Sequence, residues 1–270
     1  MGNDDTLRMP PVDNFELVEV DIVRNNSQII EIKKILPEIN FVIAGGMARH
    51  LCSPLKRREY PSDVDLYFKT GSDFEAAKSA FKFAGFTVER GGNYVASFGS
   101  PKPLCGRRTQ DNDQFYFGSH QLVRPEMLGL ENCNNLKYDV LKTFDLTVCR
   151  VVLEIDSKLN VRAFADRRFL EHEKSLKAEF EGFTDPVRFI SRICKYKLKG
   201  YEINLERIAT LYKLAKEKYP EKNGPSVEEF IKALNFSQNN PDAALKYAGI
   251  YNSSSSATAG WNRFADDCQI

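Results

Sequence analysis

The sequence contains no apolar run that approaches the length of a membrane-spanning helix. Its first residues, MGNDDTLRMPP, have neither the basic segment nor the apolar segment of a secretory signal. We therefore expect a cytoplasmic protein without membrane contact. Of the 270 residues, 42% are hydrophobic, which is enough to form a buried core in an ordinary globular protein of one or two domains.

Paired cysteines and an excess of one charge are also absent. None of the six cysteines forms a Cys-x-x-C pair, so neither a structural zinc site nor a disulfide framework is expected. The three histidines are far apart and lack the spacing of metal ligands. The 38 Lys and Arg residues nearly balance the 37 Asp and Glu residues, which gives a formal net charge of +1. Any binding of nucleic acid must therefore depend on a local patch and not on the overall charge.

The segment Phe41–Phe68 carries the clearest functional pattern, because an apolar strand, a glycine pair, a short helix and a second strand follow one another in it. On the second strand, Asp63 and Asp65 are two residues apart, so their side chains point to one face. Two carboxylates on a rigid strand without Lys or Arg suit magnesium ions, which prefer hard oxygen ligands and keep coordination positions for phosphate. Two acids on a strand also occur on ordinary solvated faces.

Gly45 and Gly46 end the first strand without side chains. Backbone N–H groups and the start of the following helix could therefore approach a triphosphate. A glycine pair also occurs in ordinary turns from a strand to a helix. The glycine pair, the helix and the Asp-x-Asp strand together, in this order, resemble the signature of the nucleotidyltransferase superfamily, which has a polymerase-β-like fold.

The resemblance implies a function for each part of the motif. Asp63 and Asp65 would bind the catalytic Mg²⁺, and Gly45 and Gly46 would hold the NTP. Arg49 follows the glycines as in the Gly-Gly-x-Val-Arg-Asp motif of the family, which places it to reach either phosphate or the neighbouring helices. This chain has His50 where the family has aspartate.

A later segment, DPVRFISR from Asp185 to Arg192, is similar to a helix of class II tRNA nucleotidyltransferases and bacterial poly(A) polymerases. This resemblance implies that Asp185 and Arg188 pair with the edges of the incoming base, with Arg192 near phosphate. A carboxylate accepts hydrogen bonds from an exocyclic amine, and a guanidinium donates to a ring nitrogen or carbonyl. The alternative is that Asp185 only caps a helix that begins at Pro186.

The run from Asp145 to Arg150, DLTVCR, is similar to the Arg-Arg-Asp-Phe-Thr strand of the same enzymes. Asp145 is therefore a candidate for a third catalytic acid or for a contact with the ribose; alternatively it caps the preceding turn. Thr143 and Phe144 stand where the family has two arginines, which weakens the expected grip on nucleotide. This variant pattern also looks like uncharacterised nucleotidyltransferases from phage genomes.

The order of elements predicts an α+β protein, because a strand-rich half is followed by a helix-rich half. We expect a flexible arm at 1–14, a mixed-sheet nucleotidyltransferase head at 15–160, a helical body at 161–250 and a flexible tail at 251–270. Within these parts, hydrophobic spacing and boundary residues predict a helix at 71–84 capped by Ser72, a hairpin of 86–90 with 94–98, a helix at 136–143, a strand at 144–155, and helices at 185–200, 204–216, 226–234 and 239–247.

The sequence thus predicts a magnesium-dependent enzyme that transfers a nucleotide from an NTP to a hydroxyl and releases pyrophosphate. An RNA or tRNA 3′ end is the favoured acceptor, and Lys195, Lys197 and Lys199 could contact its phosphates, although alternating lysines do not share one helix face. One alternative is transfer to a protein side chain or a small molecule. Another is a nucleotide-binding or structural module of the same fold that has lost catalysis.

Overall fold

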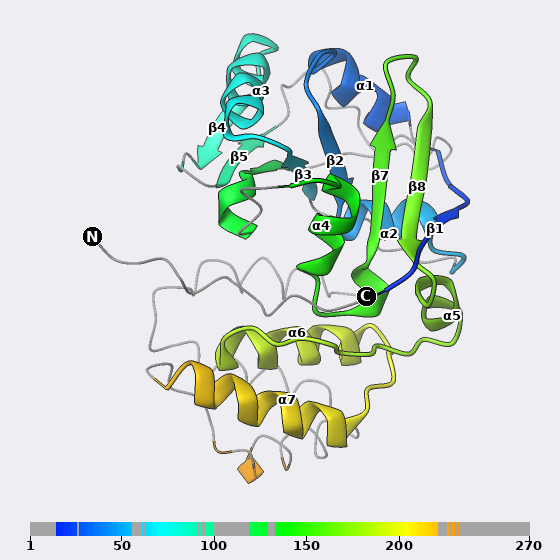
Figure 1. The fold of residues 1–270 in the computed structure, drawn as a ribbon, viewed down its shortest axis with the longest axis vertical. Helices are drawn as coiled ribbons and strands as arrows, with labels where there is room; N and C mark the ends of the chain where they lie inside the picture. Colours follow the sequence, from blue (N-terminus) through cyan, green and yellow to red (C-terminus); the bar gives the residue numbers. More distant parts are fainter. Residues whose placement is uncertain are drawn as a thin grey trace. The chain divides into compact units, whose positions relative to one another are not determined.

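The computed structural model describes residues 15–25, 27–55, 61, 63–90, 92, 95–99, 119–128, 133–220, 226, 228–229 and 232. The expected arm at 1–14 and tail at 251–270 lie outside these residues, as do the helix at 239–247 and most of that at 226–234. The predicted α+β class is confirmed, because the described residues form one mixed sheet with helices around it and a separate pair of helices (Figure 1). Among the described helices, none is both long enough and apolar enough to cross a bilayer.

Within the described residues, eight strands form the sheet in the order β1-β8-β7-β2-β3-β6-β5-β4, and these strands pair antiparallel except for β3 with β6. The strands are β1 (Leu17–Val20), β2 (Phe41–Ala44), β3 (Asp63–Phe68), β4 (Thr87–Arg90), β5 (Val95–Gly99), β6 (Ser119–Val123), β7 (Val151–Ile155) and β8 (Val161–Asp166). The helices are α1 (Ser27–Ile35), α2 (Gly46–Cys52), α3 (Gly71–Phe83), α4 (Leu136–Lys142), α5 (Phe169–Lys174), α6 (Pro186–Leu198) and α7 (Leu205–Lys218), with short 3-10 helices η3 (Pro125–Leu128) and η4 (Thr147–Cys149).

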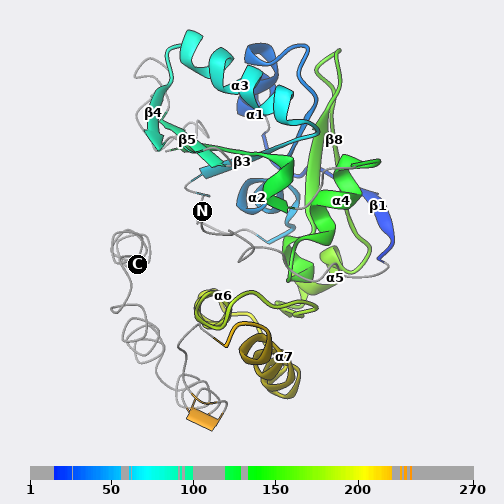
Figure 2. The ribbon, with the colours of Figure 1, turned by 60° about the vertical axis from the view of Figure 1, so that its left-hand side comes forward.

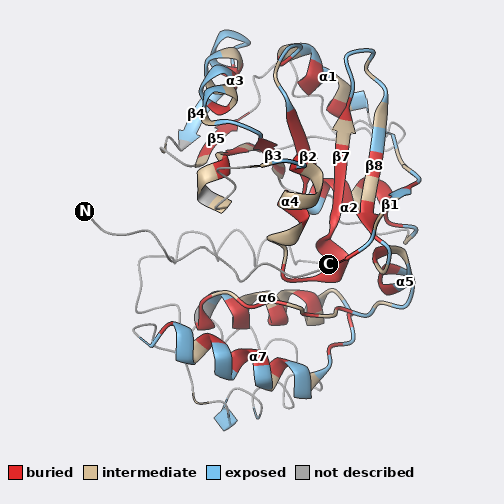
Figure 3. Cartoon of the chain, viewed as in Figure 1, coloured by how far each residue is buried: buried red, intermediate tan, exposed pale blue. Residues whose placement is uncertain are grey.

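Both faces of the sheet are covered. Alternate residues of β2 enter different cores, since Ile43 packs with residues of α1, α2 and α3, whereas Val42 packs with residues of α4. Figure 2 shows these four helices around the sheet, and Figure 3 shows β2 coloured as buried. On β3 the same alternation sends Leu66 into the first core and Tyr67 into the second. By this alternation Asp63, two positions before Asp65 and four before Tyr67, belongs to the face that α4 covers.

Three local predictions need correction. The N-cap of α3 is Thr70, whose hydroxyl accepts from the Asp73 backbone N–H at 3.1 Å, so the helix begins one residue before the predicted cap Ser72. The predicted strand at 144–155 begins only at β7, because the residues before it form a bend and η4. The helical character expected from residue 161 starts later, because β8 pairs with both β1 and β7 and so belongs to the sheet.

The chain divides into two compact units between Ser175 and Leu176. The first holds the sheet and the helices α1 to α5. The second holds α6 and α7, which lie side by side and share an aromatic core in which Phe189 contacts Phe180 at 5.3 Å and Tyr212 at 6.4 Å between ring centroids (Figure 1).

Candidate active site

The glycine turn after β2 brings the backbone close to a carboxylate. Gly45 has a φ of +75°, a conformation that side chains disfavour, and Ala44 before it is paired in register with Asp65 on β3. A Cβ atom on Gly45 would lie 2.5 Å from Asp65 Oδ2, so only glycine fits at this position. A Cβ on Gly46 would meet nothing closer than Pro61 at 3.4 Å, so space alone does not demand the second glycine.

Asp63 and Asp65 lie at the start of β3, and both side chains are half-buried. The neighbouring strand β6 places Gln121 in register with Asp65, and the Gln121 amide Nε2 donates to Asp63 Oδ2 at 2.8 Å. Two carboxylates beside a position where no Cβ fits are a donor set that suits Mg²⁺. Within the described part of the chain, no group of three or more His, Cys, Asp or Glu residues could hold a metal ion.

Asp145, the candidate third acid, is almost completely buried at 1% exposure. It precedes η4, which leads into β7. Phe144, the neighbour of Asp145, packs against Tyr67 of β3, with 6.2 Å between the ring centroids, on the face of the sheet that α4 covers. The structure thus places Gly45, Asp63 and Asp65 together, and Asp145 in a buried bend whose residue Phe144 contacts β3.

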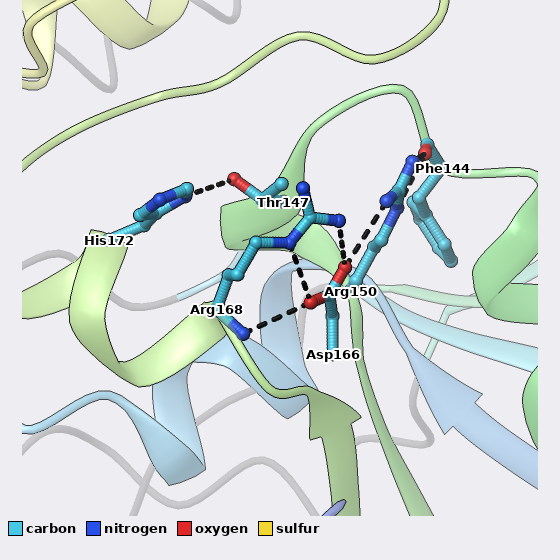
Figure 4. Close-up of polar contacts among 6 residues, drawn as sticks. All are labelled: Phe144, Thr147, Arg150, Asp166, Arg168 and His172. Atoms are coloured by element: carbon cyan, nitrogen blue, oxygen red, sulfur yellow. Dashed lines mark hydrogen bonds and ion pairs between the residues drawn. The ribbon is translucent and has the colours of Figure 1, made fainter. Parts of the chain in front are cut away.

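A buried arginine fixes the segment around η4, as Figure 4 shows. Arg150 is fully buried, and its Nε and Nη2 atoms donate to the Phe144 carbonyl at 3.1 and 2.9 Å. Its Nη1 atom lies 3.2 Å from Asp166 Oδ2 at the end of β8. The guanidinium therefore ties both sides of the bend that contains Asp145 to the sheet.

The partners of this arginine complete a network that the sequence did not predict. Burial alone would raise the pKa of Asp166, but hydrogen bonds and charge from Arg168 and Arg150 outweigh it and hold the pKa below its ordinary value. Thr147 Oγ1 and His172 Nδ1 are 2.7 Å apart, which connects η4 to α5 (Figure 4). The only signal in the sequence was an arginine within the apolar run 144–155.

Arg49 is buried on α2 and faces another helix. Its Nε atom lies 3.7 Å from Oε1 of Glu173, a completely buried residue of α5. The Ser53 hydroxyl donates to the other oxygen of the same carboxylate at 2.5 Å. Of the two expectations for Arg49, the structure therefore shows the contact with a neighbouring helix.

The candidate base-binding residues belong to the second compact unit. Asp185 Oδ1 accepts from the Arg188 backbone N–H at 3.1 Å, which confirms that Asp185 caps α6. The Arg188 Nε atom lies 3.5 Å from Asp185 Oδ2, and the Arg188 side chain is 59% exposed. Arg192 lies one turn further along α6 and is half-buried. At the start of this helix, a buried Asp185 thus both caps the backbone and pairs with an exposed Arg188.

No protein-family model matches the chain, and a sequence comparison with characterised proteins also gives no match. Solved structures do match it. A Thermotoga maritima CCA-adding enzyme complexed with tRNA has a TM-score of 0.55 at 16% identity, over 88% of this chain and 55% of that one. CCA-adding enzyme complexes with CTP and ATP have TM-scores of 0.51 and 0.50 at 14% and 16% identity, over 85% and 84% of this chain and 53% and 52% of theirs.

The chain thus spans about half the length of these proteins. At such low identity the likeness concerns the fold, and it confirms the fold predicted from the sequence: the chain shares its fold with these CCA-adding enzymes.

Proposed function

We propose that the chain is a nucleotidyltransferase that transfers a nucleotide from an NTP to an acceptor hydroxyl. The observation that supports this best is the close approach of the Asp65 carboxylate to Gly45, at a distance that leaves no space for a Cβ atom. A bare backbone beside two carboxylates offers N–H groups for a triphosphate and oxygens for a cation. In the reaction, the acceptor oxygen bonds to the α-phosphorus, the bond to pyrophosphate breaks, and the hydroxyl proton is released.

Asp63 and Asp65 would hold Mg²⁺, which when bound would neutralise the charge of the triphosphate and of the departing pyrophosphate. Gly45 would let the backbone reach the phosphates. Asp145 would assist indirectly, because its near-complete burial suits a residue that supports the turn better than one that touches substrate. Arg49 would position α2 through Glu173.

We further propose that an RNA 3′ end is the acceptor and that Asp185 and Arg188 select the base. The Asp185 carboxylate holds an exposed Arg188 guanidinium, which leaves donors of that guanidinium able to reach a base edge. The CCA-adding enzymes with a similar fold are complexed with ATP, CTP or tRNA, which supports the choice of an NTP and of RNA for this chain.

The test uses the full chain with Mg²⁺, each labelled NTP in turn and an RNA pool, and the products are separated on a denaturing gel. Asp63→Asn and Asp65→Asn should each lower transfer more than about 100-fold, because each removes a cation ligand while keeping the side-chain shape. Glu75→Gln, which neutralises an exposed carboxylate of α3 in the same unit, should leave transfer unchanged.

The position of the label distinguishes the three alternatives. Label on RNA that disappears in both aspartate variants and persists in Glu75→Gln supports the proposal. Label on protein or on a small molecule, with the same dependence on Asp63 and Asp65, identifies a different acceptor. Absence of label with every NTP and acceptor contradicts enzymatic activity and favours a nucleotide-binding module.

A further inference from the structure

The amide side chain of Gln121 lies on the same face of the sheet as the carboxylates of Asp63 and Asp65. The parallel pairing of β3 with β6 aligns Gln121 with Asp65 and Ser119 with Asp63, so the Gln121 side chain shares their face of the sheet. Its Nε2 atom donates to Asp63 Oδ2 at 2.8 Å. The amide nitrogen must be the atom that faces Asp63, because a carboxylate only accepts hydrogen bonds.

The sequence suggested Asp145 as the third acid, but burial and the observed contact with Asp63 favour Gln121 as the residue that acts on the pair. Asp145 is 1% exposed, whereas Gln121 is half-buried on the strand next to the pair and contacts one of the two carboxylates. The amide that contacts Asp63 is neutral, so it adds no third negative charge to the pair.

Resting on the proposed function, we propose that Gln121 is a positioning residue that sets the cation affinity of this site. Without a cation, its N–H group stabilises Asp63 next to the like charge of Asp65 through a charge-assisted hydrogen bond. A cation on Asp63 Oδ2 competes with that hydrogen bond. An amide at this position also adds no charge, so affinity for a divalent cation stays lower than three carboxylates would give. The site therefore binds the cation most readily when the negatively charged triphosphate binds with it.

Two substitutions separate these effects. Gln121→Glu removes the donor and adds a charge, so it should raise Mn²⁺ affinity about 10-fold and lower the melting temperature in EDTA. Gln121→Met keeps the length but removes the donor, so it should also lower the melting temperature in EDTA while raising Mn²⁺ affinity by a smaller factor. Gln28→Glu on α1 makes the same charge change away from the site and serves as the matched control.

The measurement is titration of the full chain with Mn²⁺ alone, followed by electron paramagnetic resonance of free Mn²⁺ and by the melting temperature. Increased affinity in Gln121→Glu and Gln121→Met, with wild-type affinity in Gln28→Glu, supports the inference. If Mn²⁺ binding depends on Asp63 and Asp65 but both Gln121 variants bind like the wild type, the role of Gln121 is overturned and the proposed function stands. If no binding depends on Asp63 or Asp65, the proposed cation site itself is wrong, and the role of Gln121 with it.

Discussion

At the scale of single residues, Gly45 combines two constraints that usually occur separately. Its φ of +75° with a ψ of −143° belongs to a region that is essentially restricted to glycine. The space where its Cβ would stand is taken by Asp65 Oδ2. A substitution at this position therefore disturbs both the backbone and one of the two candidate cation ligands.

We expect Gly45→Ala to lower the free energy of unfolding by about 3 kcal/mol, from backbone strain and from the collision with Asp65. Transfer activity should fall as well, because the carboxylate must move. Gly200→Ala is the matched control, since Gly200 has a φ of +80° but no atom within 4 Å of its Cβ position. It should cost only about 1 kcal/mol. Urea unfolding and the transfer assay check both variants, and equal losses in the two would contradict the role given to Asp65.

The residues that the sequence could predict are those whose signal is local. Gly45, Asp63 and Asp65 lie within one strand-turn-helix-strand unit, so their spacing alone brings them together. Gln121 and Glu173 could not be predicted in this way, because their partners, Asp63 and Arg49, lie far away in the sequence. Their contacts exist only once strand order and helix packing are known.

At the scale of elements, the boundaries were predicted where capping and apolar spacing agree. The helices α6 and α7 and the hairpin of β4 and β5 lie close to their predicted positions. The prediction of a strand at 144–155 was wrong for its first half, because apolar content cannot distinguish a buried bend from a buried strand. In this bend, Arg150 satisfies the Phe144 carbonyl, which a strand partner would otherwise do.

On β6, His120 predicts a pH dependence of stability. Burial lowers its pKa to about 4, against the opposing effect of a hydrogen bond with the Phe98 backbone, and Phe81 and Phe86 contact its ring. Between pH 6.5 and 4 the unfolded chain therefore binds a proton that the folded chain does not. The stability that this difference gives is fully present above pH 6.5. It is lost as the pH falls to 4, by about 3 kcal/mol.

His120→Leu should remove that part of the pH dependence, because leucine has a similar size and no proton to bind. Urea unfolding of both proteins at several pH values between 7 and 4 measures the difference. His50 has a pKa lowered to about 4 as well, mainly by burial, so some acid sensitivity should persist in the variant. Parallel loss of stability in the two proteins would contradict the assignment to His120.

At the scale of the whole molecule, the formal net charge of +1 bears on the proposed binding of RNA. A nearly neutral protein gains little from overall attraction, so binding should depend on a few local phosphate contacts and should weaken only moderately with salt. Lysines of α6 are the candidates from the sequence, and they belong to the unit that also holds Arg188.

We expect Lys195→Gln to reduce the slope of log affinity against log salt by about 1, since it removes one phosphate contact. Lys34→Gln, which neutralises a lysine of α1 that is paired with Glu31, should leave the slope unchanged. Fluorescence anisotropy with a labelled RNA at several salt concentrations measures both. The same slope in wild type and Lys195→Gln would show that this lysine does not contact RNA.

The strand β1 closes one border of the sheet by pairing with β8, and Phe15 just before it lies under the Arg150 guanidinium at 5.4 Å from the ring centroid. Removing the N-terminal residues through β1 would leave the backbone N–H and C=O groups of β8 that pair with β1 without hydrogen-bond partners. It would also expose the buried Arg150 guanidinium. An unpaired edge strand can form hydrogen bonds with a strand of another molecule. Expression variants should therefore keep Phe15 through Val20, or self-association will compete with folding.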